Sequence, residues 1–117
     1  MTRLRILAVL ALLASPANAE DLTPPSYQNL LTPLLQGGSD VLGTPLAYPA
    51  GTPNVTSAIV TIPPGGETGW HEHEVPLFAY VLEGELTVDY GSKGKKTYRA
   101  GEAVLEAVGW PHNGTNT

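Results

Sequence analysis

The chain of 117 residues has no cysteine, only six basic residues, and a single Phe and a single Met. Without cysteine it forms no disulfide and has no thiol for a lipid anchor. Nucleic acids and anionic lipid surfaces are bound through basic patches, so the small number of Lys and Arg argues against both as partners. The composition indicates one small acidic domain with a net charge of −5.

Long hydrophobic runs are also lacking, apart from one at the N-terminus that is shorter than the roughly 20 apolar residues of a membrane span. Two arginines precede this apolar stretch over residues 6–13, and Ala17-Asn18-Ala19 follows it. This order predicts a signal peptide over residues 1–19, cut after Ala19. The mature chain would keep four basic and eleven acidic residues, a net charge of −7. We expect it in the bacterial periplasm or secreted, without membrane insertion after cleavage.

Residues 20–39 form a proline-rich arm in which prolines limit any helix to a turn or two. The arm also carries a short apolar cluster, formed by Leu30, Leu31, Leu34 and Leu35. We expect the arm to pack across the following domain or against a second subunit of a homodimer. A fraying terminus is the alternative.

From Asp40 onward, short β-branched and aromatic stretches alternate with turns rich in Gly and Pro. Turn signals at intervals of about 8–12 residues are typical of a β-sandwich or barrel. The pattern predicts strands over residues 41–42, 45–48, 55–62, 70–73, 77–82, 85–90, 97–99 and 103–107, with a hairpin tip at 91–94. An amphipathic helix of useful length is lacking here as well.

Two of the three histidines, His71 and His73, lie one residue apart. On a strand their side chains would point to the same face, with Cβ atoms about 6.5–7 Å apart. Two imidazoles on one face can bind a single divalent ion, and His112 can add a third nitrogen if the fold closes. Such a neutral triad suits zinc, copper or iron better than magnesium or calcium. The alternative is that these are buried, hydrogen-bonded histidines without a metal.

The histidines are part of two longer motifs in which the chain resembles the cupin superfamily. The first motif, G-x5-H-x-H-x3-4-E-x6-G, is matched at Gly65, His71, His73 and Gly84. The second, G-x5-P-x-G-x2-H-x3-N, is matched at Gly101, Gly109, His112 and Asn116. Eight of the ten motif positions agree, in order, over residues 65–116. Two linked motifs are far more specific than a lone H-x-H.

The resemblance implies an all-β fold, a double-stranded β-helix or jelly-roll barrel, over residues 40–117. It implies that the three histidines bind one divalent transition metal, namely Fe, Mn, Cu, Zn or Ni, and that the protein binds or acts on a small polar molecule. Because cupins support many chemistries, a dioxygenase-like oxidoreductase, an isomerase and a lyase all remain open. The alternative is a non-catalytic ligand-binding or structural module without metal.

Two positions depart from the motifs: Leu77 stands in place of a glutamate ligand, and Ala107 in place of the proline. Leucine cannot coordinate a metal, so Glu106 is the candidate carboxylate that compensates. Facing inward among apolar neighbours, it would be a fourth ligand, a hydrogen-bond acceptor for a histidine, or a catalytic base. Facing outward, it would be a solvated surface residue. Leu77, Tyr80 and Trp110 are the candidate pocket residues.

The chain ends at Thr117, directly after the second motif. Cupins commonly supply one or two further strands beyond this point. The resemblance therefore leaves two expectations: that the last strands of the barrel are missing, or that the N-terminal segment takes over their pairing. An edge left open beside His112 would loosen the site and invite pairing with a strand of another chain.

Overall fold

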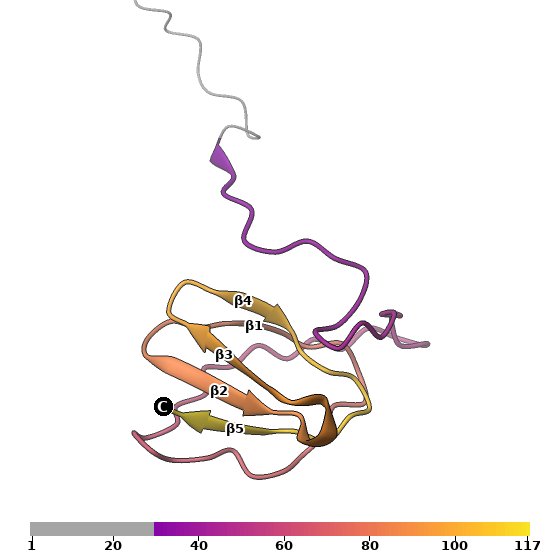
Figure 1. Ribbon diagram of the computed structural model, residues 1–117. Coiled ribbons are helices and arrows are strands. Elements are labelled where there is room, and N and C mark those ends of the chain that lie inside the picture. The colour runs from indigo at the N-terminus through magenta and orange to yellow at the C-terminus, as the bar shows by residue number, and fades with distance from the viewer. Residues whose placement is uncertain (1–29) are drawn as a thin grey trace, which may run out of the picture. The chain divides into compact units, whose positions relative to one another are not determined.

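The computed structural model describes residues 30–117 (Figure 1). The predicted signal peptide and the first part of the proline-rich arm lie outside the described residues. In the described part of the chain, no helix has the length and apolar character needed to cross a membrane. Residues 32–117 form one compact unit, which contains all the strands described below.

Within residues 30–117, five short strands build two antiparallel sheets (Figure 1). They are β1 (Phe78–Tyr80), β2 (Glu85–Asp89), β3 (Lys95–Arg99), β4 (Ala103–Leu105) and β5 (Asn113–Asn116). β1 pairs with β4, and β2 lies between β3 and β5. Two small antiparallel sheets are the layered arrangement of a jelly roll and confirm the predicted all-β class.

The core of the domain lies on one face of β2 and its continuation. Alternate residues of a strand share a face, and here Leu86, Val88 and Tyr90 do so. Val88, Tyr90 and Ala107 are buried, and half-buried apolar side chains pack against them. Tyr90, Val88 and His112 are the largest fully buried side chains of the described chain. The core therefore reaches directly to one of the predicted metal ligands.

The β2–β3 hairpin confirms the predicted reversal at residues 91–94. Its tip is a short 3-10 turn over Gly91–Lys93, and the pairing starts at Asp89 opposite Lys95. Gly91 and Gly94 have φ of 62° and 88°, values that side-chain-bearing residues rarely adopt. The Asp89 carboxylate accepts a hydrogen bond from the Gly91 N–H (2.8 Å) and so caps the turn.

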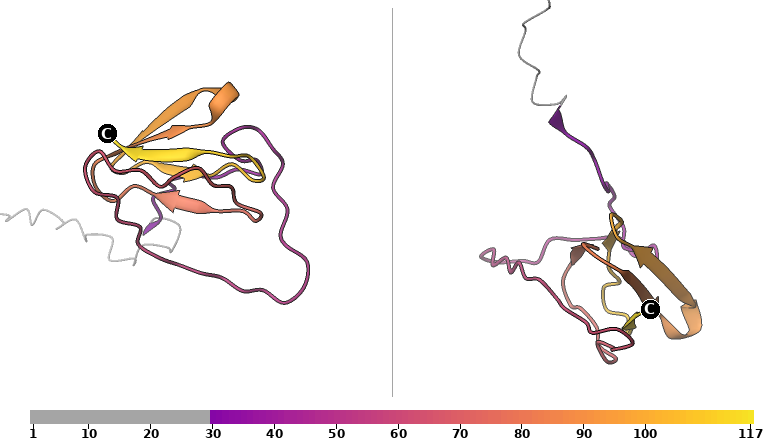
Figure 2. Two further views of the ribbon diagram at one scale, coloured as in Figure 1. Left: turned by 90° about the horizontal axis from the view of Figure 1, so that it is seen from below. Right: turned by 90° about the vertical axis from the view of Figure 1, so that its left-hand side faces the viewer.

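The prediction of a strand over residues 55–62 is wrong. The segment has β-branched residues, but within residues 30–117 no backbone–backbone hydrogen bond joins it to another segment. A strand requires a paired neighbour as well as suitable side chains, and this segment has none there. In Figure 2 the earlier part of the long connection before β1 loops away from the sheets. Its later part, over residues 65–71, returns and is hydrogen-bonded to β5 and His112.

The shorter predicted strands at residues 41–42, 45–48 and 70–73 are also reduced. A turn at Asp40–Thr44 replaces the first, and the second is reduced to a single bridge between Ser39 and Pro45. The third consists of two isolated bridges, one at each histidine. Conversely, β5 was not predicted, because three of its four residues, Asn113, Gly114 and Asn116, belong to types that are depleted in strands. In the remaining part of the arm, Leu34 and Leu35 are exposed, and packing of the arm against a second subunit stays a prediction.

Candidate metal centre

The backbone brings His71 and His112 directly opposite each other. The His71 N–H donates to the His112 carbonyl (3.0 Å), and the His112 N–H donates to the His71 carbonyl (2.9 Å). Residues that exchange both hydrogen bonds of an antiparallel pair carry their side chains on the same face. His73 lies two residues further along the same extended segment, so its side chain points to that face too.

A second backbone contact holds His73 close to the loop that leads to His112. The Gly109 N–H donates to the His73 carbonyl (2.7 Å). Gly109 has φ of 61°, which allows the chain to turn sharply there before it enters β5. Both histidine-bearing segments are therefore fixed by main-chain hydrogen bonds and not by the imidazoles themselves.

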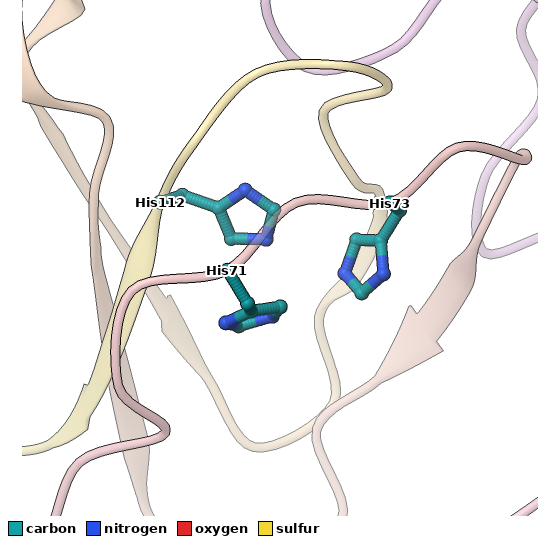
Figure 3. A group of neighbouring side chains, drawn as sticks. All are labelled: His71, His73 and His112. Atoms are coloured by element: carbon teal, nitrogen blue, oxygen red, sulfur yellow. The ribbon is translucent and has the colours of Figure 1, made fainter.

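The three imidazole rings face one another (Figure 3). Their centroids are 4.5 Å apart for His71 and His112, and 5.0 Å for each of the other two pairs. One ring nitrogen of each lies within 4.8 Å of the others. A point equidistant from three atoms so spaced is at most about 2.8 Å from each, whereas Zn–N bonds are about 2.0–2.1 Å long. Ring movements of less than about 1 Å would complete the coordination of one ion.

Hydrogen bonds to the His71 and His112 rings determine which nitrogen of each ring is free to bind a metal. His71 Nδ1 is 2.8 Å from the Gly69 carbonyl oxygen, and His112 Nδ1 is 2.8 Å from that of Trp110. A carbonyl oxygen only accepts, so both Nδ1 atoms must carry the proton and donate it. The Nε2 lone pairs are then available to a metal, as is usual for histidine ligands held by a backbone carbonyl.

The site is buried at one end and open at the other. His112 is 2% exposed, His73 is half-buried, and His71 is exposed. Burial lowers the pKa of His73, the electrostatic effects of His112 and His71 lower it further, and the negative charge of Glu106 only partly opposes them. The lowered pKa favours the neutral form of His73, in which a ring nitrogen can bind a metal. Exposed His71 leaves this end of the cluster open to solvent.

Glu106 points inward and is 7% exposed. Its Oε1 accepts hydrogen bonds from the Tyr90 hydroxyl (2.8 Å) and from the Ala107 N–H (2.7 Å). Burial, together with the hydrogen bonds to Tyr98 and Glu106, raises the pKa of Tyr90, so its hydroxyl stays protonated and donates. The Tyr90 oxygen in turn lies 3.2 Å from the Tyr98 hydroxyl, which must then be the donor.

The Glu106 carboxylate lies behind the histidines, on the side of Tyr90. It is not one of the potential metal ligands, because that group in the described chain consists of the three histidines alone. The Tyr90 ring also packs against His112, with centroids 5.8 Å apart. The negative charge of Glu106 acts on His73, where it opposes the lowering of the pKa, and the hydrogen bond from Tyr90 holds the Glu106 carboxylate in place.

Replacing Glu106 by glutamine should weaken divalent metal binding about 10–100-fold, the range typical of residues behind the ligands. Glutamine keeps an oxygen that accepts from Tyr90 but removes the negative charge. Metal affinity is measured by competition with a chromophoric chelator. Glu72→Gln, at an exposed position between the two histidines, is the matched control and should bind like the wild type. Equal metal affinities for the wild type and both variants would show that Glu106 has no role in metal binding.

The three predicted pocket residues lie in different places. Leu77 is half-buried, and its carbonyl accepts from the Glu106 N–H (2.9 Å). Tyr80 is 41% exposed on β1. The Trp110 indole N–H donates to the Tyr90 carbonyl (2.9 Å), and Lys93 Nζ lies 4.1 Å from the centre of a Trp110 ring. Trp110 thus joins the β2–β3 hairpin to the loop whose carbonyl orients His112.

Sequence reasoning missed Asp40, which is 6% exposed. Its Oδ1 accepts from the N–H groups of Leu42 (2.9 Å) and Thr44 (2.8 Å), and its Oδ2 accepts from the Val108 N–H (2.9 Å). Val108 is bridged to His73. An aspartate two residues before the turn Leu42-Gly43 is a recognisable turn signal, but its contact with Val108 spans the whole domain and leaves no local trace.

Comparison with known proteins agrees with this geometry. The family model described as the cupin domain matches residues 58–117, a region that contains all three histidines and Glu106. Searches of curated proteins and of solved structures gave no match. The family match covers half of the chain and both motifs, and the chain therefore belongs to the cupin family.

Proposed function

We propose that this protein is an exported cupin that binds one divalent transition-metal ion through His71, His73 and His112 and presents it to a small polar molecule. The observation that carries the proposal is the convergence of three imidazole nitrogens within 4.8 Å of one another. Two of these rings are held by backbone carbonyls with Nε2 free. Three neutral nitrogen ligands suit Zn, Fe, Cu, Ni or Mn.

Three protein ligands leave coordination positions open, and a metal held in this way can polarise or activate an oxygen-containing ligand. The residues of the chain determine where such a ligand enters. His112 closes the buried end of the site, and exposed His71 leaves the other end accessible. Glu106 provides a negative charge behind the histidines. It is the candidate general base, a role that requires a bound molecule, or one bridging water, within hydrogen-bond reach of its carboxylate. Dioxygenase-like, isomerase and lyase activities are the classes to screen.

A non-catalytic cupin module is the second candidate, and Leu77 favours it. The leucine at this position gives the site one oxygen ligand and one negative charge fewer than the cupin motif provides. A module of this kind would retain a small ligand or serve a structural role without turnover. Metal content separates a metal-free module from the first proposal, and activity screening of the loaded protein separates a metal-binding module from an enzyme.

Reconstitution with metal tests the proposal directly. Protein stripped with a chelator and dialysed against Fe, Mn, Cu, Zn or Ni should retain about one equivalent of at least one of them, measured by elemental analysis. At a free metal concentration 100 times the dissociation constant, binding adds about 2.7 kcal/mol to the free energy of unfolding. For a domain of this size, that should raise Tm by about 10 °C or more. Protein that retains no metal and shows no shift would overturn the proposal.

Export is tested separately. When the gene is expressed in a bacterial host, mass spectrometry of the periplasmic fraction should find a chain that begins at Glu20. A full-length chain confined to the cytoplasm would contradict the predicted signal peptide without affecting the metal centre.

A further inference from the structure

Three contacts join Tyr90, Trp110 and His112 in a closed cycle. His112 Nδ1 donates to the Trp110 carbonyl (2.8 Å). The Trp110 indole N–H donates to the Tyr90 carbonyl (2.9 Å). The Tyr90 ring completes the cycle by packing against the His112 ring, with centroids 5.8 Å apart. Each of the three residues therefore restrains the other two.

The β2–β3 hairpin holds the Trp110 side chain from two directions. Its indole N–H meets the Tyr90 carbonyl, which also accepts from the Lys93 N–H (3.2 Å) in the turn at the hairpin tip. Lys93 Nζ lies 4.1 Å from the centre of a Trp110 ring, and a cation over an aromatic face is attracted to it. The half-buried ring also packs against the core cluster around Tyr90. The position of the indole is therefore determined by the hairpin and the core.

The Trp110 carbonyl has less support from its own backbone. It belongs to the peptide group that joins Trp110 to Pro111, and proline has no N–H that a hydrogen bond could hold. Gly109, just before it, has φ of 61° and lacks the Cβ that would restrict rotation of this loop. The orientation of the carbonyl therefore depends on where the Trp110 side chain is anchored. If the carbonyl turned away, His112 Nδ1 would lose its acceptor, and the proton could move to Nε2.

We propose that Trp110 is a positioning residue of the metal centre, and that its anchored indole keeps its own main-chain carbonyl directed at His112. In this orientation the His112 ring retains the proton on Nδ1 and presents the Nε2 lone pair to the cluster. The effect on metal affinity rests on the proposed function, because it requires a metal at the three histidines. The tautomer of His112 is a property of the metal-free chain and can be measured without a metal.

NMR of the metal-free protein tests the orientation of His112 directly. At mildly alkaline pH, long-range proton–nitrogen spectra show which nitrogen of each neutral imidazole carries the proton, and wild-type His112 should carry it on Nδ1. Trp110→Phe keeps an aromatic ring but removes the indole N–H, and His112 should then populate both tautomers. His71, whose Nδ1 is held by the Gly69 carbonyl (2.8 Å), is the internal control and should keep its tautomer. An unchanged His112 tautomer in Trp110→Phe would overturn the proposal.

Metal affinity gives a second measure of the same role. Trp110→Phe should weaken zinc binding about 10–100-fold, the range typical of groups that orient metal ligands. Chelator competition measures the affinity under conditions in which urea unfolding shows the variant to be folded. Trp70→Phe, which changes an exposed tryptophan next to His71 (59% exposed), is the matched control and should bind zinc like the wild type. A Trp110→Phe protein that unfolded more easily but kept the wild-type zinc affinity would contradict the proposal.

The fluorescence of Trp110 gives a test that leaves this residue in place. The chain has two tryptophans, so Trp70→Phe leaves Trp110 as the single emitting indole. Coupling is reciprocal, so zinc bound to His112 should shift the emission of the indole that orients this ring, with the midpoint of zinc binding. Constant emission while zinc saturates the site would contradict the proposal. A protein that binds no zinc would count against the proposed function, and the His112 tautomer would still decide the role of Trp110.

Discussion

Replacing His71 or His112 by alanine should each lower divalent metal affinity on the order of 10²–10³-fold. Structural zinc sites gain about 10–16 kcal/mol from about four ligands, so one ligand accounts for roughly 3 kcal/mol. The two variants should differ in stability, however. His112 is fully buried against Tyr90, whereas His71 is exposed. We therefore expect the metal-free His112→Ala protein to unfold more easily than the wild type, and metal-free His71→Ala to unfold like it.

Measuring affinity and stability on the same proteins separates a metal centre from a merely structural cluster. Affinity is measured by chelator competition and stability by urea unfolding of the metal-free forms. Glu72→Ala, between the two ligands in sequence, should change neither quantity. If His71→Ala bound metal as tightly as the wild type, the three-histidine site would be wrong even if His112→Ala lost metal, because loss of the buried residue could act through the fold.

Replacing Asp40 by alanine should lower the free energy of unfolding by about 3 kcal/mol, because three backbone N–H groups lose their acceptor. That is a large share of the roughly 5–15 kcal/mol typical of a small domain. Asp89→Ala is the matched control, because Asp89 also caps a turn two residues ahead but is more exposed. Urea unfolding should show the larger loss for Asp40→Ala. An equal or smaller loss would mean that the Asp40 contacts do not anchor the loop at Val108.

The same residue gives a pH dependence with a defined sign. Burial of Asp40 works against ionisation, but hydrogen bonds from the Val108, Thr44 and Leu42 N–H groups outweigh it, and the pKa lies below the usual 3.8. A lowered folded-state pKa means that the stabilisation is complete above the pKa of the unfolded chain and is lost as pH falls through the folded value. The stability difference between wild type and Asp40→Asn should therefore be constant near neutral pH and shrink below about pH 4.

The histidine site was predictable because its signal is local and repeated. The H-x-H spacing places His71 and His73 on one face whether the segment is a strand or only extended, and the second motif identifies His112. Glu106 was harder, because alternation along a short strand does not say which face is inside. The structure shows that Glu106 points inward, where it is 7% exposed and accepts a hydrogen bond from Tyr90.

The wrong strand predictions arise because sequence shows which residue types favour strands but not which segments will pair with each other. The segment 55–62 has the side chains of a strand, but a strand exists only where another segment supplies hydrogen bonds. β5 has the opposite character: three of its four residues are poor strand formers, yet pairing with β2 and a bridge to the segment before β1 make it a strand. The turn role of Asp40 has a local signal, but its contact with Val108 could not be found from sequence, because that donor is 68 residues away.

The pairing of His71 with His112 has a consequence for the stability of the domain. All of β1 to β4 lies between these two residues in the chain. An ion bound to both rings would close a loop of about 40 residues, as a covalent cross-link does. The entropy that is lost when a loop closes grows only slowly with the length of the loop. In a protein with no cysteine, the cation would take over the task that a disulfide performs in many exported domains.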